Sequence, residues 1–286
     1  MEKVRFYNPE TVAETLDLLE QYSEKAVIVN GGTDIVEKIA KGNISPEAII
    51  YIQNVKELKS ITAVNGYVSI GGAVTYAEIQ ASSVCQQFVA LQNVICELGS
   101  APIRAVATPA GNIGTASPAA DCNVALVALG AEIVIANKNG ERIIAAEDMF
   151  ASYGQTQLRP NEVITAIRLT TVKKGTSSAF LKLARRKTQD IAQVSVAVCI
   201  YTDGAVIEDV RIALGAVAPA TIRAFSFEAL IKGKTIQDAV RTIKDKIPEE
   251  AVLRRPRNKA YKEAVMGVLT ARAIVQAFTG EEGGEQ

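Results

Sequence analysis

Apolar residues recur along this chain with two different periods, which together predict short helices and short strands. Val12, Leu16 and Leu19 follow the spacing of one buried helical face. The preceding Asn8 and Pro9 suit the N-cap and the first position of a helix, so we expect the first helix to begin there. Apolar runs between turn residues predict strands over 26–29, 48–51, 61–64, 68–70, 132–136, 163–169, 194–201 and 210–217. Helical spacing predicts further helices over 35–41, 88–98, 119–129, 225–231, 236–243 and 259–278.

The pattern breaks at residues 173–178, and we place a domain boundary there. We expect a first domain over 1–173, with subdomains at about 1–56 and 57–173, a second domain over 174–280, and a flexible tail over 281–286. In the second domain strands precede helices. This order predicts an α+β fold with helices on one face of an antiparallel sheet.

Within the first domain, residues 99–118 are rich in Gly, Pro, Ser and Thr and separate two predicted helices. Such a segment cannot be regular structure throughout. A loop this long inside a compact domain is usually functional, so candidate binding residues are expected here.

The composition excludes several classes of function. The 286 residues suffice for two domains, and 31 basic against 31 acidic side chains leave no net charge to attract nucleic acid or an anionic membrane. The chain has no histidine. It therefore lacks Ser-His-Asp and Cys-His nucleophile pairs, a His general base and any metal site that needs imidazole.

The four cysteines are not spaced for a metal. Cys85, Cys96, Cys122 and Cys199 include no C-x-x-C pair, so we expect no iron–sulfur cluster or structural zinc on this chain alone. Each lies in an apolar stretch, which predicts a buried thiol. The N-terminus lacks a signal-peptide pattern, and no window reaches about 18 uninterrupted apolar residues. We expect a reduced, cytoplasmic protein.

Two segments have the composition of loops that hold a phosphorylated ligand with backbone atoms. In the first, a predicted strand runs into residues 30–34, Asn-Gly-Gly-Thr-Asp, where paired glycines allow a tight turn with successive N–H groups turned outward. The second, 108–121, combines small residues, hydroxyls and one carboxylate just before a helix. Either segment alone is better explained as an ordinary glycine turn.

Together with a third segment, 180–192, these loops resemble the FAD-binding subunit of the molybdenum hydroxylases. That family includes bacterial xanthine dehydrogenases, carbon monoxide dehydrogenase and nicotinate dehydrogenase. The similarity covers essentially the whole chain, and the ordered set of three motifs is more specific than any one. The resemblance implies an FAD domain of the vanillyl-alcohol-oxidase type, followed by a small α+β C-terminal domain.

The resemblance also implies partners. One partner subunit would carry two two-iron, two-sulfur clusters, and another would carry the molybdenum–molybdopterin cofactor, in a dimer of heterotrimers. Electrons would pass from molybdenum through the clusters to FAD on this chain and then to NAD⁺. The substrate would react on another polypeptide.

The same resemblance implies which residues contact FAD. The first family loop, around the pyrophosphate, matches Val27, Ile28, Val29, Asn30, Gly31, Gly32, Thr33 and Asp34. The second matches Thr108, Pro109, Ala110, Gly111 and Asn112, followed by Ser117 at a hydroxyl position and Asp121 at an acidic position near the ribose and adenine. Ile164 matches an apolar position beside the flavin, and Lys182 a lysine close to the isoalloxazine ring. A positive charge there favours the anionic reduced flavin. The alternative for Lys182 is a solvated lysine at a strand end.

Three residues depart from the family pattern. Asn30 stands where the family usually has Ala, and Pro109 and Ala110 precede Gly111 where it usually has a second Gly. Ala tolerates positive φ poorly, so a left-handed backbone at Ala110 would weaken FAD binding. The departures motivate an alternative, a non-catalytic subunit that kept the fold but lost FAD. A flavin subunit that uses an acceptor other than NAD⁺ also stays open, because no NAD fingerprint is visible.

Overall fold

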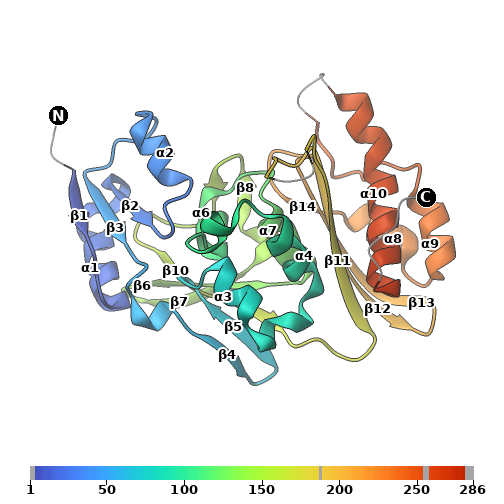
Figure 1. The fold of residues 1–286 in the computed structure, drawn as a ribbon, viewed down its shortest axis with the longest axis horizontal. Coiled ribbons are helices and arrows are strands. Elements are labelled where there is room, and N and C mark those ends of the chain that lie inside the picture. The colour runs from blue at the N-terminus through green and yellow to red at the C-terminus, as the bar shows by residue number, and fades with distance from the viewer. Residues whose placement is uncertain (1–3, 187–188, 254–257, 281–286) are drawn as a thin grey trace.

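Three blocks of secondary structure lie in a row, with the N-terminal block at one end and the C-terminal block at the other (Figure 1). The computed structural model describes residues 4–186, 189–253 and 258–280. The predicted tail, 281–286, lies outside the described residues, and so do residues 187 and 188 of the third sequence motif.

The N-terminal block is a small parallel sheet with two helices. Its strands lie in the order β1 (Arg5–Tyr7), β3 (Ala48–Tyr51) and β2 (Ala26–Val29). Its helices are α1 (Val12–Tyr22) and α2 (Ile35–Ala40). The prediction that the first helix begins at Asn8 was wrong. Thr11 is the N-cap, because its hydroxyl accepts a hydrogen bond from the N–H of Glu14 and so satisfies one of the unpaired donors of the first turn.

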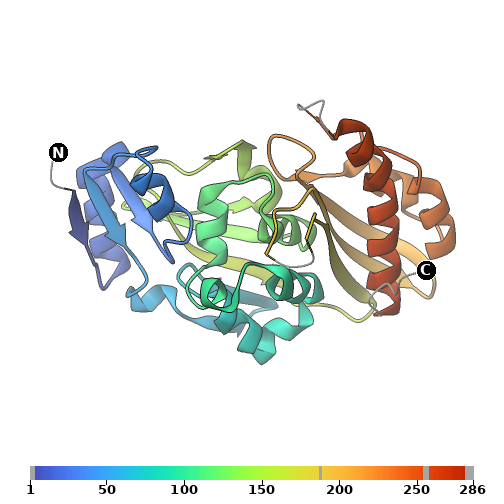
Figure 2. The ribbon, with the colours of Figure 1, turned by 45° about the horizontal axis from the view of Figure 1, so that its top comes forward.

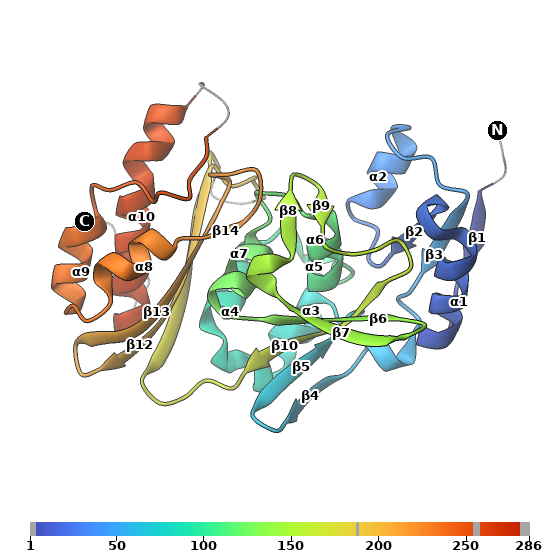
Figure 3. The same cartoon turned by 180° about the vertical axis from the view of Figure 1, so that it is seen from behind.

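The middle block is built on a five-stranded antiparallel sheet. Its strands lie in the order β4 (Ile61–Val64), β5 (Tyr67–Gly71), β10 (Val163–Thr170), β6 (Glu132–Asn137) and β7 (Gly140–Ala145). A two-stranded hairpin, β8 (Phe150–Ser152) and β9 (Gln155–Thr156), lies beside helix α6 (Figure 3). The helices are α3 (Tyr76–Ala81), α4 (Val89–Glu97), α5 (Ala101–Arg104), α6 (Pro109–Thr115) and α7 (Asp121–Ala128). The segment 99–118 is thus irregular with two short helices inside it, as its composition predicts.

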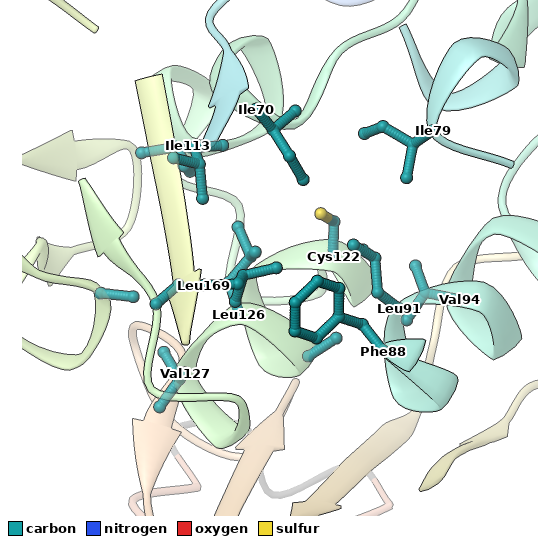
Figure 4. Packing of buried hydrophobic residues seen from close by; sticks show 14 of the residues in the cluster. Ile70, Ile79, Phe88, Leu91, Val94, Ile113, Cys122, Leu126, Val127 and Leu169 are labelled. Atoms are coloured by element: carbon teal, nitrogen blue, oxygen red, sulfur yellow. The ribbon is translucent and has the colours of Figure 1, made fainter. Parts of the chain in front are cut away.

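The largest hydrophobic core lies between this sheet and its helices. Phe88 and Leu91 of the α4 region pack with Leu126 of α7 and Leu169 of β10 (Figure 4). The same core includes Phe180 from the next block, so apolar packing continues across the predicted domain boundary.

The C-terminal block is a four-stranded antiparallel sheet with helices on its outer face (Figure 2). Its strands lie in the order β11 (Thr176–Leu183), β12 (Val194–Asp203), β13 (Val206–Gly215) and β14 (Ile222–Arg223), and its helices are α8 (Phe225–Ile231), α9 (Ile236–Ile243) and α10 (Lys259–Thr279). Helix α10 packs on β11 and β12, which confirms the predicted α+β arrangement. Two differences stand out. Strand β11 begins inside the predicted break, and the other face of the sheet is covered by α4 and α7 of the middle block.

The prediction of four buried thiols was partly wrong. Cys85 and Cys122 are buried and Cys199 is intermediate, but Cys96 is exposed. Cys96 lies in the last turn of α4, where the helix leaves the core. Among the described helices, none is both long enough and apolar enough to span a bilayer.

Candidate functional site

A cavity of about 590 Å³ lies between the N-terminal and middle blocks. This volume falls in the range of ligand pockets, about 300–1,000 Å³. One wall consists of the loop after β2 and helix α2, and the facing wall consists of the segment 107–120 with α6. Gly154 of the β8–β9 hairpin and the turn leading into β10 complete it. The two glycine-rich segments of the sequence therefore meet at one site.

The loop after β2 approaches the second segment backbone to backbone. A Cβ atom on Gly31 would lie 2.0 Å from the carbonyl oxygen of Val106, so only glycine fits there. Gly32 adopts φ 72°, a conformation that glycine adopts without strain. Within the described residues, the N–H groups of 31–34 have no acceptor. This wall thus offers a run of free backbone donors, which suits an anionic group.

Asn30 fixes this loop to both neighbouring structures. Its amide nitrogen donates to the carbonyl of Gly72 at 2.7 Å, and its amide oxygen accepts a hydrogen bond from the side chain of Gln53. Asn30 is 7% exposed. The departure from the family pattern at this position therefore has a structural role, because the amide joins the N-terminal block to the end of β5.

The second segment forms the first turn of α6. The Thr108 hydroxyl accepts a hydrogen bond from the N–H of Gly111 at 3.0 Å, and Pro109 occupies the first helical position, where no N–H is needed. Ala110 is helical. The concern that Ala110 would be strained at positive φ was wrong, because the left-handed residue of this segment is Ala116, which ends the helix at φ 47°.

Side chains of the two loops also meet. The Thr115 hydroxyl donates to a carboxylate oxygen of Asp34 at 3.2 Å, and Asp34 pairs with Lys38 at 2.6 Å. The amide oxygen of Asn112 is buried, and no donor among the described residues reaches it. A buried acceptor without a partner costs about 1–3 kcal/mol.

A buried carboxylate forms part of the cavity lining. The side chain of Glu162 is fully buried, and its two oxygens accept hydrogen bonds from Arg142 at 2.8 and 2.7 Å. The N–H of Arg159 donates to it at 2.9 Å. The hydrogen bonds from Arg142, with help from the Arg159 backbone, hold the pKa of Glu162 below its ordinary value.

A second buried ion pair lies outside the cavity lining. The ammonium of Lys182, on β11, donates to Asp121, the first residue of α7, at 2.8 Å. Their side chains are 7% and 9% exposed. The interpretation of Lys182 as a solvated lysine was therefore wrong. Burial raises the pKa of Asp121, while the charge of Lys182 opposes that rise.

The structure brings most of the predicted site residues together. The cavity is lined by Val27, Ile28, Asn30, Gly31, Gly32, Thr33, Asp34, Thr108, Ala110, Gly111, Asn112, Ser117 and Ile164. Four predicted residues do not line it: Val29, Pro109, Asp121 and Lys182. Val29 and Pro109 are buried supports for the loops.

The sequence interpretation missed several lining residues. Lys38 of α2 and Thr115 of α6 line the cavity, and so do four residues of the turn before β10: Leu158, Arg159, Pro160 and Glu162. The turn carried a signal that could have been used. It is a Leu-Arg-Pro-Asn-Glu segment directly before the strand of Ile164, so its charged residues had to lie beside that position.

Comparison with known families gives two matches that follow one another along the chain. A model described as the FAD binding domain in molybdopterin dehydrogenase matches residues 2–170. A model described as the CO dehydrogenase flavoprotein C-terminal domain matches residues 179–277.

Individual relatives are similar over nearly the same length. The glyceraldehyde dehydrogenase medium chain of Sulfolobus acidocaldarius is 30% identical, with 94% of this chain and 96% of that protein covered. The carbon monoxide dehydrogenase medium chain of Hydrogenophaga pseudoflava is 29% identical, with 96% and 97% covered. Xanthine dehydrogenase of Emericella nidulans is 28% identical over 82% of this chain, but the chain spans only 18% of that longer protein.

Solved structures show the same fold. Carbon monoxide dehydrogenase from Hydrogenophaga pseudoflava, in a form that lacks the Mo-pyranopterin moiety, superposes with a TM-score of 0.88 at 29% identity, covering 96% of this chain and 97% of that one. Quinoline 2-oxidoreductase from Pseudomonas putida 86 superposes with a TM-score of 0.87 at 24% identity over 98% of each chain.

The buried Glu162 pair predicts a specific pH dependence of stability. Because the folded-state pKa of Glu162 is lowered, its contribution is present above the ordinary value of 4.5 and is lost as pH falls through the folded-state pKa. Glu162→Gln should lower the free energy of unfolding by about 1–3 kcal/mol at pH 7. Urea titrations should show a smaller difference from the wild type at acid pH.

A matched control is the exposed pair of Glu47 and Lys25, whose side chains are 45% and 65% exposed. Glu47→Gln should cost less than about 1 kcal/mol at pH 7. Equal losses for the two variants would contradict a special role for Glu162.

Proposed function

The chain belongs to the family of FAD-binding subunits of the molybdenum hydroxylases, of the CO dehydrogenase and xanthine dehydrogenase type, and we propose that its cavity holds one FAD that relays electrons. The electrons would come from iron–sulfur clusters of a partner subunit and leave to NAD⁺. Bound FAD would supply the redox chemistry, and this chain's residues would bind it, orient it and exclude water.

One observation carries the proposal, the meeting of two backbone loops at a single cavity. The N–H groups of 31–34 have no acceptor among the described residues, and they suit the two negative charges of a pyrophosphate. Asp34 is the acidic residue of this loop, but its charge is offset by Lys38 at 2.6 Å. The loop can therefore accept an anion.

The remaining lining fits the other parts of FAD. Asn112 and Ser117 are polar residues of the lining, and FAD offers several hydroxyl and N–H groups that polar side chains can pair with. Ile164 supplies an apolar contact for a planar ring. We assign the pyrophosphate to the first loop and the ring to the side of Ile164. Asp121 and Lys182 act from behind the wall of residues 119 and 120.

The relatives support the proposed partners. Similar chains are named a medium chain, an FAD-subunit and a subunit beta, all names of parts of larger assemblies. The match to 18% of one xanthine dehydrogenase corresponds to the same segment within a longer protein. We propose that separate iron–sulfur and molybdopterin subunits complete the enzyme here, in a dimer of heterotrimers. The four cysteines form no disulfide, which fits a cytoplasmic location.

The structure gives no support to the alternative of a subunit that lost FAD. Asn30 makes two buried hydrogen bonds, Pro109 occupies a favourable helical position, and Ala110 is unstrained. The three departures that suggested the alternative are therefore compatible with an intact cavity.

The FAD site can be tested at Gly31. Gly31→Ala places a methyl group against the Val106 carbonyl and must push the two loops apart. The purified complex should lose most of its flavin, with affinity for FAD lowered at least about tenfold. Flavin content after gel filtration and fluorescence titration of the apoprotein measure this.

Gly114→Ala is the matched control. Gly114 also lines the cavity, but nothing lies within 4 Å of its would-be Cβ. It should retain FAD and gain up to about 1 kcal/mol of helix stability. A wild-type complex without stoichiometric flavin would refute the proposal, and so would full flavin retention by Gly31→Ala.

The acceptor can be tested with NADH. Anaerobic mixing of the purified complex with NADH should bleach the flavin absorption, because hydride transfer between flavin and nicotinamide is reversible. Dithionite serves as the positive control. If dithionite reduces the flavin and NADH does not, the acceptor is not NAD⁺, which leaves the FAD assignment intact.

A further inference from the structure

We infer that Asp121 is a positioning residue that holds the Lys182 ammonium behind the cavity wall and offsets its charge, so that the flavin site adjoins an ion pair rather than a lone cation. The inference rests on the proposed FAD site. It assigns to Asp121 an indirect role in place of the direct contact that the sequence resemblance implies.

The Lys182 ammonium is bound by residues of one block, the middle block. Lys182 belongs to the C-terminal sheet, but its partners belong to the middle block. They are Asp121 at 2.8 Å, the carbonyl oxygen of Glu97 at 3.5 Å and the carboxylate of Glu97 at 4.0 Å. With its side chain only 7% exposed, Lys182 has little freedom to turn elsewhere. The middle block therefore determines where this charge lies.

Asp121 is placed to act on the cavity through Lys182. It directly follows Ala119 and Ala120, which line the cavity, so the ion pair lies behind that wall. Although Asp121 is in the first turn of α7, the helix has no side-chain cap. Its second oxygen is buried without a donor among the residues that the structure describes. Among the described residues, Lys182 is thus the one charged side chain within ion-pair distance of this carboxylate.

The charges decide the expected effect on the flavin. A lone buried ammonium would favour the anionic reduced flavin, whereas an adjacent carboxylate cancels most of its field beyond a few ångströms. Removal of the Asp121 charge alone should expose most of that field, because the other carboxylate near the ammonium, that of Glu97, is 4.0 Å away and 40% exposed. Removal of both charges should change little, because neutral replacement of a buried ion pair is often tolerated.

The test is a redox titration of the flavin in the purified complex. Asp121→Asn keeps the size of the side chain and removes its charge. We expect reduced flavin to be favoured over oxidised flavin at least about tenfold more than in the wild type, which is a rise of about 30 mV for a two-electron couple. An unchanged potential would overturn the inference.

The double variant Asp121→Asn with Lys182→Met identifies the route of the effect and carries no buried charge that could prevent folding. Its potential should return to within about 10 mV of the wild type. If the double variant keeps the raised potential, Asp121 does not act through Lys182. If the potential of the double variant falls well below that of the wild type, Asp121 does not offset the charge of Lys182 in the wild type. Either of these two outcomes would contradict the inference.

A control variant separates electrostatics from loosened packing between the blocks. Glu147, in the middle block, pairs with Arg211 at 2.6 Å and with Arg223 at 2.9 Å in the C-terminal sheet, and none of the three lines the cavity. Glu147→Gln should lower thermal stability without moving the flavin potential. An equal shift in this variant would overturn the inference. Absence of flavin from the wild-type complex would instead refute the proposed function.

Discussion

The close approach of two backbone segments, at Gly31 and Val106, determines where the cavity of this protein forms. No side chain fits between the glycine and the facing carbonyl, so the loop after β2 lies directly against the segment before α6. Asn30 strengthens the same junction with buried hydrogen bonds to both blocks. The N–H groups of residues 31–34 are left without acceptors in the described part of the chain, at the point where two separate sheets meet. The cavity is therefore a property of the junction rather than of either sheet.

Much of the fold could be predicted because its signals are local. The apolar run before the paired glycines identified β2, and the helical spacing near residues 236–243 identified α9 within its observed bounds. The start of α1 was missed because Asn8 and Pro9 form a good helix start by themselves. The capping interaction of Thr11 with Glu14 was the stronger local signal.

The sequence predicted only the part of the candidate site that consists of backbone loops. Glycine and small residues mark such loops in a sequence, and those predictions led to the cavity. The pair of Arg142 and Glu162 has no comparable signal in the sequence, because Arg142 lies on β7, Glu162 precedes β10, and β6 lies between these two strands in the sheet. The partner of Lys182 lies 61 residues earlier in the chain and in another block. No local pattern reports a contact of that kind.

Helix α7 belongs to the core of the middle block and also packs on the sheet of the C-terminal block. All eight of its residues are buried, and it packs on the C-terminal strands β12 and β13 as well as against α4. A helix that is buried on every side cannot lose one neighbour without exposing apolar surface to water. The two family models divide the chain between residues 170 and 179, yet a protein cut there would leave α7 half uncovered. The two segments match separate family models, whereas in the folded chain they are joined by apolar packing around one shared helix.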